Sequence, residues 1–162
     1  MYNIKIDTCL KRIFLISLLS IIFAYFIEYI LGYQPCNLCL IERIPYGLSI
    51  ILIISNYFFN KNKRFIILLL TLIFAFSILI SFYHFGIEQD FFEESALCGI
   101  KDASNVISKE ELLNQLQLKT ISCKDVTFRI FGLSLTTFNI VISLVIFILS
   151  IKILKNYEEI KS

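Results

Sequence analysis

Four long apolar runs constrain the fold of this chain more than any other feature. Three of them cover about residues 13–31, 65–85 and 130–151, and each is close to the length of about 20 residues that crosses the hydrocarbon core of a bilayer. The last of these runs carries no charged residue. With 57% hydrophobic and 17% charged residues, the chain lacks the polar surface that a soluble domain of this size needs. The sequence therefore predicts a small polytopic membrane protein.

The remaining apolar run, from Ile44 to Phe59, is too short to cross a bilayer alone. It becomes long enough if its helix starts near Cys36 and includes Glu42 and Arg43, so we expect this span to cover about residues 40–59. The first run exceeds the apolar segment of about 7–15 residues in a signal peptide, and no small-residue cleavage pattern follows it. The expected fold class is therefore an all-α membrane protein, a four-helix transmembrane bundle that forms one domain over residues 1–162.

The basic residues predict the orientation of this bundle. Lys and Arg accumulate in short segments on the cytoplasmic side of a membrane. Basic residues precede the first run, fill the NKNKR turn between the second and third runs, and follow the last run: Lys5, Lys11, Arg12, Lys61, Lys63, Arg64, Lys152, Lys155 and Lys161. We therefore expect both termini to be cytoplasmic. Two loops, about 32–39 and 86–129, are then expected to lie on the outer side.

Four of the five cysteines fall on this outer side. Cys36 and Cys39 form a CxxC pair in the stretch QPCNLCLIER, and Cys98 and Cys123 lie in the long outer loop, whereas Cys9 lies on the cytoplasmic side. Disulfides form and persist outside the reducing cytosol. A disulfide between residues three apart closes a very small loop and stabilises a fold poorly, so we interpret the CxxC pair as a thiol exchange centre.

Helical spacing predicts that Cys36, Cys39 and Arg43 share one face of a helix. Pro35 favours a helix start at this point, and the helix dipole lowers the pKa of a thiol in the first turn. A guanidinium one turn from a thiolate stabilises the anion, and a charge facing the membrane is a functional candidate, although an interfacial arginine is also a common anchor. His84 is the only histidine, with proton transfer or plain hydrogen bonding as its expected role.

The second pair, Cys98 and Cys123, has two interpretations. A bridge between them could be purely structural, closing a loop at a gain of about 3–4 kcal/mol, or the pair could be the second dithiol that exchange requires. Between them, SKEELLNQLQL at residues 108–118 starts with a capping box and predicts a short amphipathic helix on the outer leaflet. Four cysteines could also hold zinc, but only the first pair has the spacing of a zinc knuckle, so we expect no metal.

Three other polar residues lie in or near the spans. Glu28 is close to the outer end of the first span, where we expect it to reach lipid headgroups. Thr137 and Asn139 lie in the fourth span and are expected to bind a neighbouring helix.

Together these motifs resemble those of the disulfide bond formation protein B (DsbB) family, the quinone-linked oxidases of the bacterial inner membrane. QPCNLCLIER is similar to the family signature Q-P-C-x-L-C-x-x-[QE]-R, and YHFGIE is similar to the end of the third helix. CGI at residue 98 and SCKDVTFRIFGLSLTTFN resemble the two arms of the second outer loop and the entry to the fourth helix. The likeness runs from about residue 12 to residue 150.

This resemblance implies a membrane thiol:quinone oxidoreductase with its redox cysteines facing the periplasm. Cys98–Cys123 would be attacked by a reduced DsbA-like protein of thioredoxin fold, with Cys98 forming the mixed disulfide. That pair would exchange with Cys36–Cys39, and Cys39 would donate electrons to a quinone, either ubiquinone or menaquinone. Arg43 and His84 are the candidate quinone-binding residues. The implied partners are the DsbA-like protein, membrane lipid and the quinone pool, with no nucleic acid.

Two alternatives are kept. A relative of vitamin K epoxide reductase would also couple quinone, thiols and a small helical bundle, but its CxxC follows the loop cysteines, whereas here it precedes them. A non-enzymatic membrane scaffold would use both pairs as structural disulfides. The scaffold predicts that both pairs stay oxidised when quinone is depleted, and the oxidase predicts that they do not.

Overall fold

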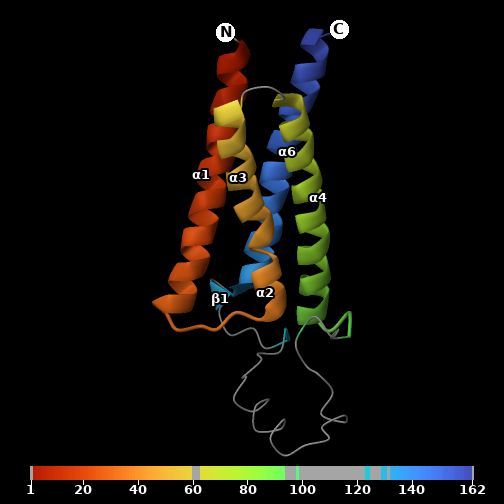
Figure 1. Ribbon diagram of the computed structural model, residues 1–162. Helices are drawn as coiled ribbons and strands as arrows, with labels where there is room; N and C mark the ends of the chain where they lie inside the picture. Colours follow the sequence, from red (N-terminus) through yellow and green to blue (C-terminus); the bar gives the residue numbers. More distant parts are fainter. Residues whose placement is uncertain are drawn as a thin grey trace, which may run out of the picture.

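Long helices dominate the computed structural model, which describes residues 2–59, 63–93, 98, 123–124, 129–130 and 132–161. The helices are α1 (Tyr2–Tyr29), α2 (Asn37–Ile41), α3 (Ile44–Phe59), α4 (Lys63–Glu88) and α6 (Leu135–Lys161) (Figure 1). Within the described residues, four stretches are long and apolar enough to cross a membrane: Ile6–Tyr29, Asn37–Phe58, Lys63–Glu88 and Leu135–Lys155. The predicted all-α fold with four membrane-spanning helices is confirmed. The segment 108–118, predicted as an amphipathic helix, lies outside the described residues.

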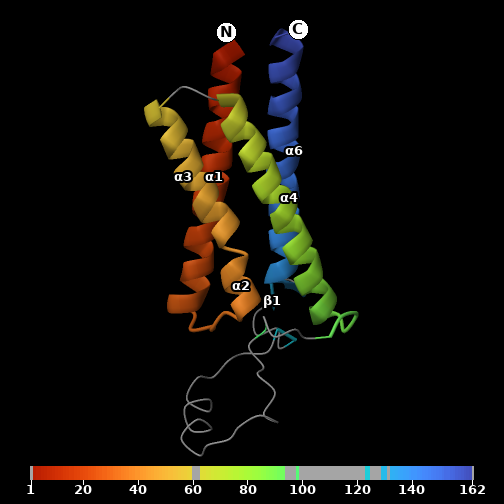
Figure 2. The same ribbon diagram turned by 45° about the vertical axis from the view of Figure 1, so that its right-hand side comes forward.

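The long helices form a closed ring in the order α1, α3, α4, α6. The most extensive packing is between α4 and α6, followed by α1 against α3 and α3 against α4, and contacts between α1 and α6 complete the ring. Both termini lie at one end of the bundle (Figure 1). The short helix α2 lies at the opposite end (Figure 2). An ion pair at the end with the termini, from Lys63 Nζ to Asp7 Oδ1 at 3.1 Å, joins α4 to α1.

Apolar side chains line the inside of the ring and also cover much of its outside. The core consists of Ile6, Leu10, Ile13, Tyr46, Ile67, Leu70, Phe74, Ile146 and Ile153, with the free cysteine Cys9 packed against it. Large apolar side chains such as Leu19, Phe76 and Leu79 are exposed on the outer surface. An apolar outer surface of this extent is expected where a protein contacts lipid.

Hydroxyl and amide groups inside the ring join the helices to one another. We call this set the hydroxyl network: Ser17, Tyr46, Ser49, Ser77, Ser81, Asn139 and Ser143. Ser49 donates to Ser17 at 2.8 Å, and Asn139 donates to Ser81 at 2.7 Å while its carbonyl oxygen accepts from Tyr46. Small polar residues let helices approach closely and bond across the interface in a membrane. The predicted contact of Asn139 with a neighbouring helix is therefore confirmed.

The fourth span begins later than predicted. Instead of starting at residue 130, α6 starts at Leu135, because β1 (Arg129–Ile130) pairs antiparallel with β2 (Leu133–Ser134). Gly132 lies in the turn with a φ of +82°, a conformation that residues with a side chain rarely adopt. Ser134 caps the helix by accepting the N–H of Thr137 at 3.3 Å. Thr137 also contacts the Ser134 hydroxyl at 3.2 Å, so among the described residues its hydrogen bonds are with its own helix start and not with the neighbouring helix that we expected.

The second span is interrupted between α2 and α3, whereas the sequence predicted one continuous helix. The break lies at Glu42 and Arg43, where the N–H of Arg43 bonds Leu40 in a tight turn. Pro45 explains this break, since it has no N–H to donate to the carbonyl of Ile41 four residues earlier. The first piece, α2, nevertheless starts where we predicted, with Cys36 as its N-cap. The span therefore reaches back to the CxxC pair in two pieces.

Candidate functional site

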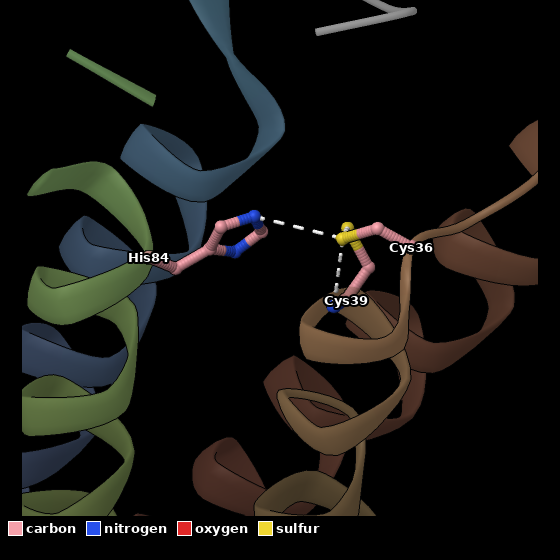
Figure 3. Close-up of side chains that lie close together, drawn as sticks. All are labelled: Cys36, Cys39 and His84. Carbon is pink, nitrogen blue, oxygen red and sulfur yellow. Dashed lines mark hydrogen bonds between the residues drawn. The ribbon is translucent and has the colours of Figure 1, made fainter. Parts of the chain in front are cut away.

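The CxxC pair lies at the start of α2, with both thiols free. Cys36 is buried, has an extended backbone, and accepts the backbone N–H of Cys39 at 3.3 Å. This cap turns the two side chains toward each other, so that their sulfurs lie 2.8 Å apart (Figure 3). The pair can therefore become a disulfide with only a small rotation of the side chains.

His84 of α4 points at this pair from across the bundle (Figure 3). Its Nε2 lies 3.6 Å from Cys36 Sγ, and its Nδ1 lies 3.0 Å from a carboxylate oxygen of Glu42. The hydroxyl of Thr136 on α6 is 3.3 Å from the same Nδ1. All three partners of the imidazole are buried. An imidazole held between a thiol and a carboxylate is the arrangement that moves a proton to or from the thiol, because the carboxylate stabilises the imidazolium.

The surroundings of Cys36 favour its thiolate. The pKa of Cys36 is lowered to about 4: the hydrogen bond from the Cys39 thiol has the largest effect, burial acts in the opposite direction, and the imidazole of His84 also lowers the pKa. The backbone N–H of Cys39 acts in the same direction. The sequence predicted a lowered pKa from the helix start, and the structure attributes most of the lowering to the second thiol. The reduced pair is thus prepared as one thiolate and one thiol.

The second cysteine pair joins the first in a single apolar cluster. Cys98 and Cys123 form a disulfide with their Cα atoms 5.6 Å apart, and both are almost fully buried. They pack with Cys36, Leu38 and Ile87, and the side chains of Cys39, Ile41 and Tyr83 pack around them. We call this set the cysteine cluster. Exchange between two pairs requires direct approach of a thiolate to a disulfide sulfur, and the cysteine cluster brings the two pairs together in an environment with little water.

Among the described residues, the side-chain contacts of Arg43 are with α1 and not with the thiols, contrary to the prediction that it lies against Cys39. Its Nη1 donates to Glu28 on α1, and its guanidinium lies 5.1 Å from the centre of the Tyr25 ring. The physical reason is the break at Glu42 and Arg43, since the face shared by residues 36, 39 and 43 exists only on a continuous helix. Glu28, expected to reach headgroups, binds Arg43 instead.

The same thiols and imidazole also resemble a metal-ligand set. The ligand atoms of Cys36, Cys39 and His84 all lie within 4.8 Å of one another. Two thiolates at about 2.3 Å from a tetrahedral zinc ion are about 3.8 Å apart. The observed separation of 2.8 Å is much shorter, so the geometry favours thiol–disulfide chemistry over metal binding.

Sequence reasoning missed Glu42 and Thr136. Glu42 was included in the second span only to reach the required length, although an acidic group within a span is itself a functional candidate. Its position three residues after Cys39 and the presence of one histidine in the chain were the available signals. Thr136 gave no signal, because a threonine at the start of an apolar helix is common.

A reduced pair and a disulfide in one buried cluster of a four-helix membrane bundle define the class of membrane thiol–disulfide oxidoreductases. The family model described as "Disulfide bond formation protein DsbB" matches residues 7–153. The chain belongs to the DsbB family, as the motifs predicted. An uncharacterized protein of Rickettsia prowazekii (strain Madrid E) is 27% identical over 140 residues, which cover 82% of this chain and 78% of that protein. No solved structure matches the chain.

Proposed function

We propose that this protein is a thiol:quinone oxidoreductase of the bacterial inner membrane that reoxidises a periplasmic DsbA-like protein and so supports disulfide formation in periplasmic proteins. Membership of the DsbB family supports oxidoreductase activity on protein disulfides. The observation that carries the proposal is the cysteine cluster, in which the reduced Cys36 and Cys39 pack with the disulfide Cys98–Cys123. In this proposal both termini are cytoplasmic and the cysteine cluster faces the periplasm.

The first exchange oxidises the partner. A thiolate of the reduced partner attacks Cys98, the bond between Cys98 and Cys123 breaks, and Cys123 leaves as a thiolate. The second thiolate of the partner then attacks the mixed disulfide and releases Cys98. The partner is now a disulfide, and two electrons reside on Cys98 and Cys123.

The second exchange moves these electrons to the CxxC pair. A thiolate of the loop pair attacks the oxidised form of Cys36–Cys39, and the loop disulfide is restored as both CxxC sulfurs are reduced. The described arrangement, with Cys36 and Cys39 free and Cys98–Cys123 bonded, corresponds to the state after this step. His84 can hold one of the protons, since its ring nitrogens face Cys36 and Glu42.

The residues near this end of the bundle fit a quinone. A quinone supplies two carbonyl oxygens and accepts two electrons and two protons. Arg43 offers N–H donors to such an oxygen, and its side chain is only 18% exposed. Cys39 would be the electron donor once its thiol has passed its proton to the Cys36 thiolate 2.8 Å away. His84, which faces Cys36, would deliver a proton to the quinone, and the exposed apolar surface of the helices suits the ring and its tail.

Thiol trapping in membranes tests this function. Cells with and without quinone are quenched with acid, and their free thiols are alkylated with a reagent that adds mass. We expect the four outer cysteines to be more reduced when quinone is depleted, and a Cys123→Ala variant to accumulate a mixed disulfide with the DsbA-like partner through Cys98. If the outer cysteines keep the same oxidation state in both membranes, the protein is a scaffold and the proposed function is wrong.

A further inference from the structure

A glutamate on α1 holds the arginine that the proposed function assigns to quinone binding. Glu28 accepts a hydrogen bond from Nη1 of Arg43, and the two side chains are 22% and 18% exposed. Tyr25 lies three residues before Glu28, so its ring is on the same face of α1, and the guanidinium lies 5.1 Å from the ring centre. One helix face therefore offers both a carboxylate and an aromatic ring to a single guanidinium.

The backbone around Arg43 does not determine where its side chain points. Arg43 lies in the break between α2 and α3, where its N–H bonds Leu40 three residues earlier, and regular helical bonding resumes with the N–H of Gly47. A long arginine side chain at a membrane boundary would otherwise extend toward the headgroups and water. The contacts with α1 are thus what keep the guanidinium within the bundle.

The contact with Glu28 also leaves part of the guanidinium able to bind a ligand. An arginine carries five N–H donors in a planar group, and the structure gives one of its nitrogens, Nη1, to Glu28. The negative charge of Glu28 lowers the cost of keeping Arg43 out of water, because a half-buried charge is tolerated when it is paired. Tyr25 fixes the plane of the group through its ring face.

We propose that Glu28 is a positioning residue for the quinone. Glu28, together with the ring of Tyr25, orients the guanidinium of Arg43 so that the remaining N–H donors of Arg43 bind a quinone carbonyl oxygen. This inference rests on the proposed function. Glu28 touches neither thiol pair among the contacts of the described residues, so it acts through Arg43. Removing its charge releases the arginine and weakens quinone binding without changing thiol exchange with the partner.

The test compares two α1 variants in purified full-length protein. Glu28→Gln removes the charge at nearly constant size. Asp7→Asn is the matched control, since Asp7 lies near the start of α1, far along the helix from Glu28, and also forms an ion pair, with Lys63. Binding of a short-chain quinone is measured by calorimetry in detergent. The rate at which phenylglyoxal modifies Arg43 is measured on quinone-free protein by peptide mass spectrometry, and mixed-disulfide formation through Cys98 is measured with the reduced partner.

For Glu28→Gln we expect the quinone Kd to rise about tenfold, which corresponds to about 1.4 kcal/mol. Modification of Arg43 should become several times faster, and mixed-disulfide formation should stay within about twofold of wild type. Asp7→Asn should match wild type in all three measurements. Glu28→Asp keeps the charge on a shorter side chain and should give intermediate values, and it replaces the glutamine variant if that variant does not fold.

Three outcomes would overturn the inference: an unchanged or lower Kd in Glu28→Gln, an unchanged rate of Arg43 modification, or a parallel loss of quinone binding and thiol exchange. These outcomes are distinct from a failure of the proposed function. If the proposed function were wrong, the wild-type protein itself would bind no quinone and would not oxidise the partner.

Discussion

The contact between Glu42 and His84 leads to a quantitative prediction for the electron-transfer step. Glu42→Gln keeps an oxygen that can accept from Nδ1 of His84 but removes the negative charge 3.0 Å from the ring. Hydrogen bonds to charged groups contribute about 1.5–3 kcal/mol, and those between neutral groups about 0.5–1.5 kcal/mol. The substitution therefore removes about 1–1.5 kcal/mol of stabilisation from an imidazolium that holds the thiol proton.

This loss corresponds to a decrease of about 5- to 12-fold in the rate of the step that needs the imidazolium, at 1.36 kcal/mol for each factor of ten. Glu42→Ala removes the whole bond and should decrease the rate by about 10- to 150-fold. The assay is a single turnover in which protein preloaded with quinone is mixed with the reduced partner, and quinone absorbance is followed by stopped flow. Mixed-disulfide formation in the same samples should be unchanged.

The matched control for this prediction is Glu88→Gln. Glu88 is an acid at the same end of α4 as His84 and accepts a hydrogen bond from Ser134 at 2.7 Å, away from the imidazole. If Glu42→Gln reduces quinone at the wild-type rate, or if Glu88→Gln slows this step as much as Glu42→Gln does, the carboxylate has no electrostatic role at the imidazole and the reasoning is refuted.

Two further predictions concern the thiols and the helix contacts. Because the pKa of Cys36 is lowered to about 4, its thiolate is present above that pH. Its alkylation rate, measured by peptide mass spectrometry, should therefore be nearly constant between about pH 5 and 8. A tenfold rise in this rate for each pH unit would contradict the prediction. Asn139→Ala removes bonds to Ser81 and Tyr46 and should destabilise the bundle by about 1 kcal/mol, at about 0.6 kcal/mol for each interhelical bond. Denaturant unfolding in micelles measures that change, and an unchanged free energy of unfolding would contradict the prediction.

The features that the sequence could predict are those set by local composition and spacing. The length and polarity of the apolar runs were sufficient for the four spans. Cys36 as a helix start followed from Pro35 and from the short second run, and the structure has Cys36 as the N-cap of α2. The family followed from the spacing of Cys36, Cys39 and Arg43, which is a property of the chain and needs no coordinates.

The contacts of Arg43 and His84 could not be predicted, for two physical reasons. Arg43 was assigned to the face of Cys39 on the assumption of a continuous helix. Pro45, which has no N–H for the carbonyl of Ile41, breaks that helix at Glu42 and Arg43. His84 meets Glu42 and Thr136 only because α4 and α6 have particular rotations about their axes. The rotation of a helix that is apolar on all sides leaves little trace in its sequence.

The position of Thr136 on the last helix has a consequence for biosynthesis. A chain is made from its N-terminus, so the segments that form α1 to α4 leave the ribosome before α6 is complete. At that stage Cys36, His84 and Glu42 have all been synthesised, but the imidazole still lacks the hydroxyl of Thr136, and α4 lacks the helix with which it packs most extensively. The order of synthesis thus delays completion of the contacts around His84 until α6 has been made, after both thiol pairs.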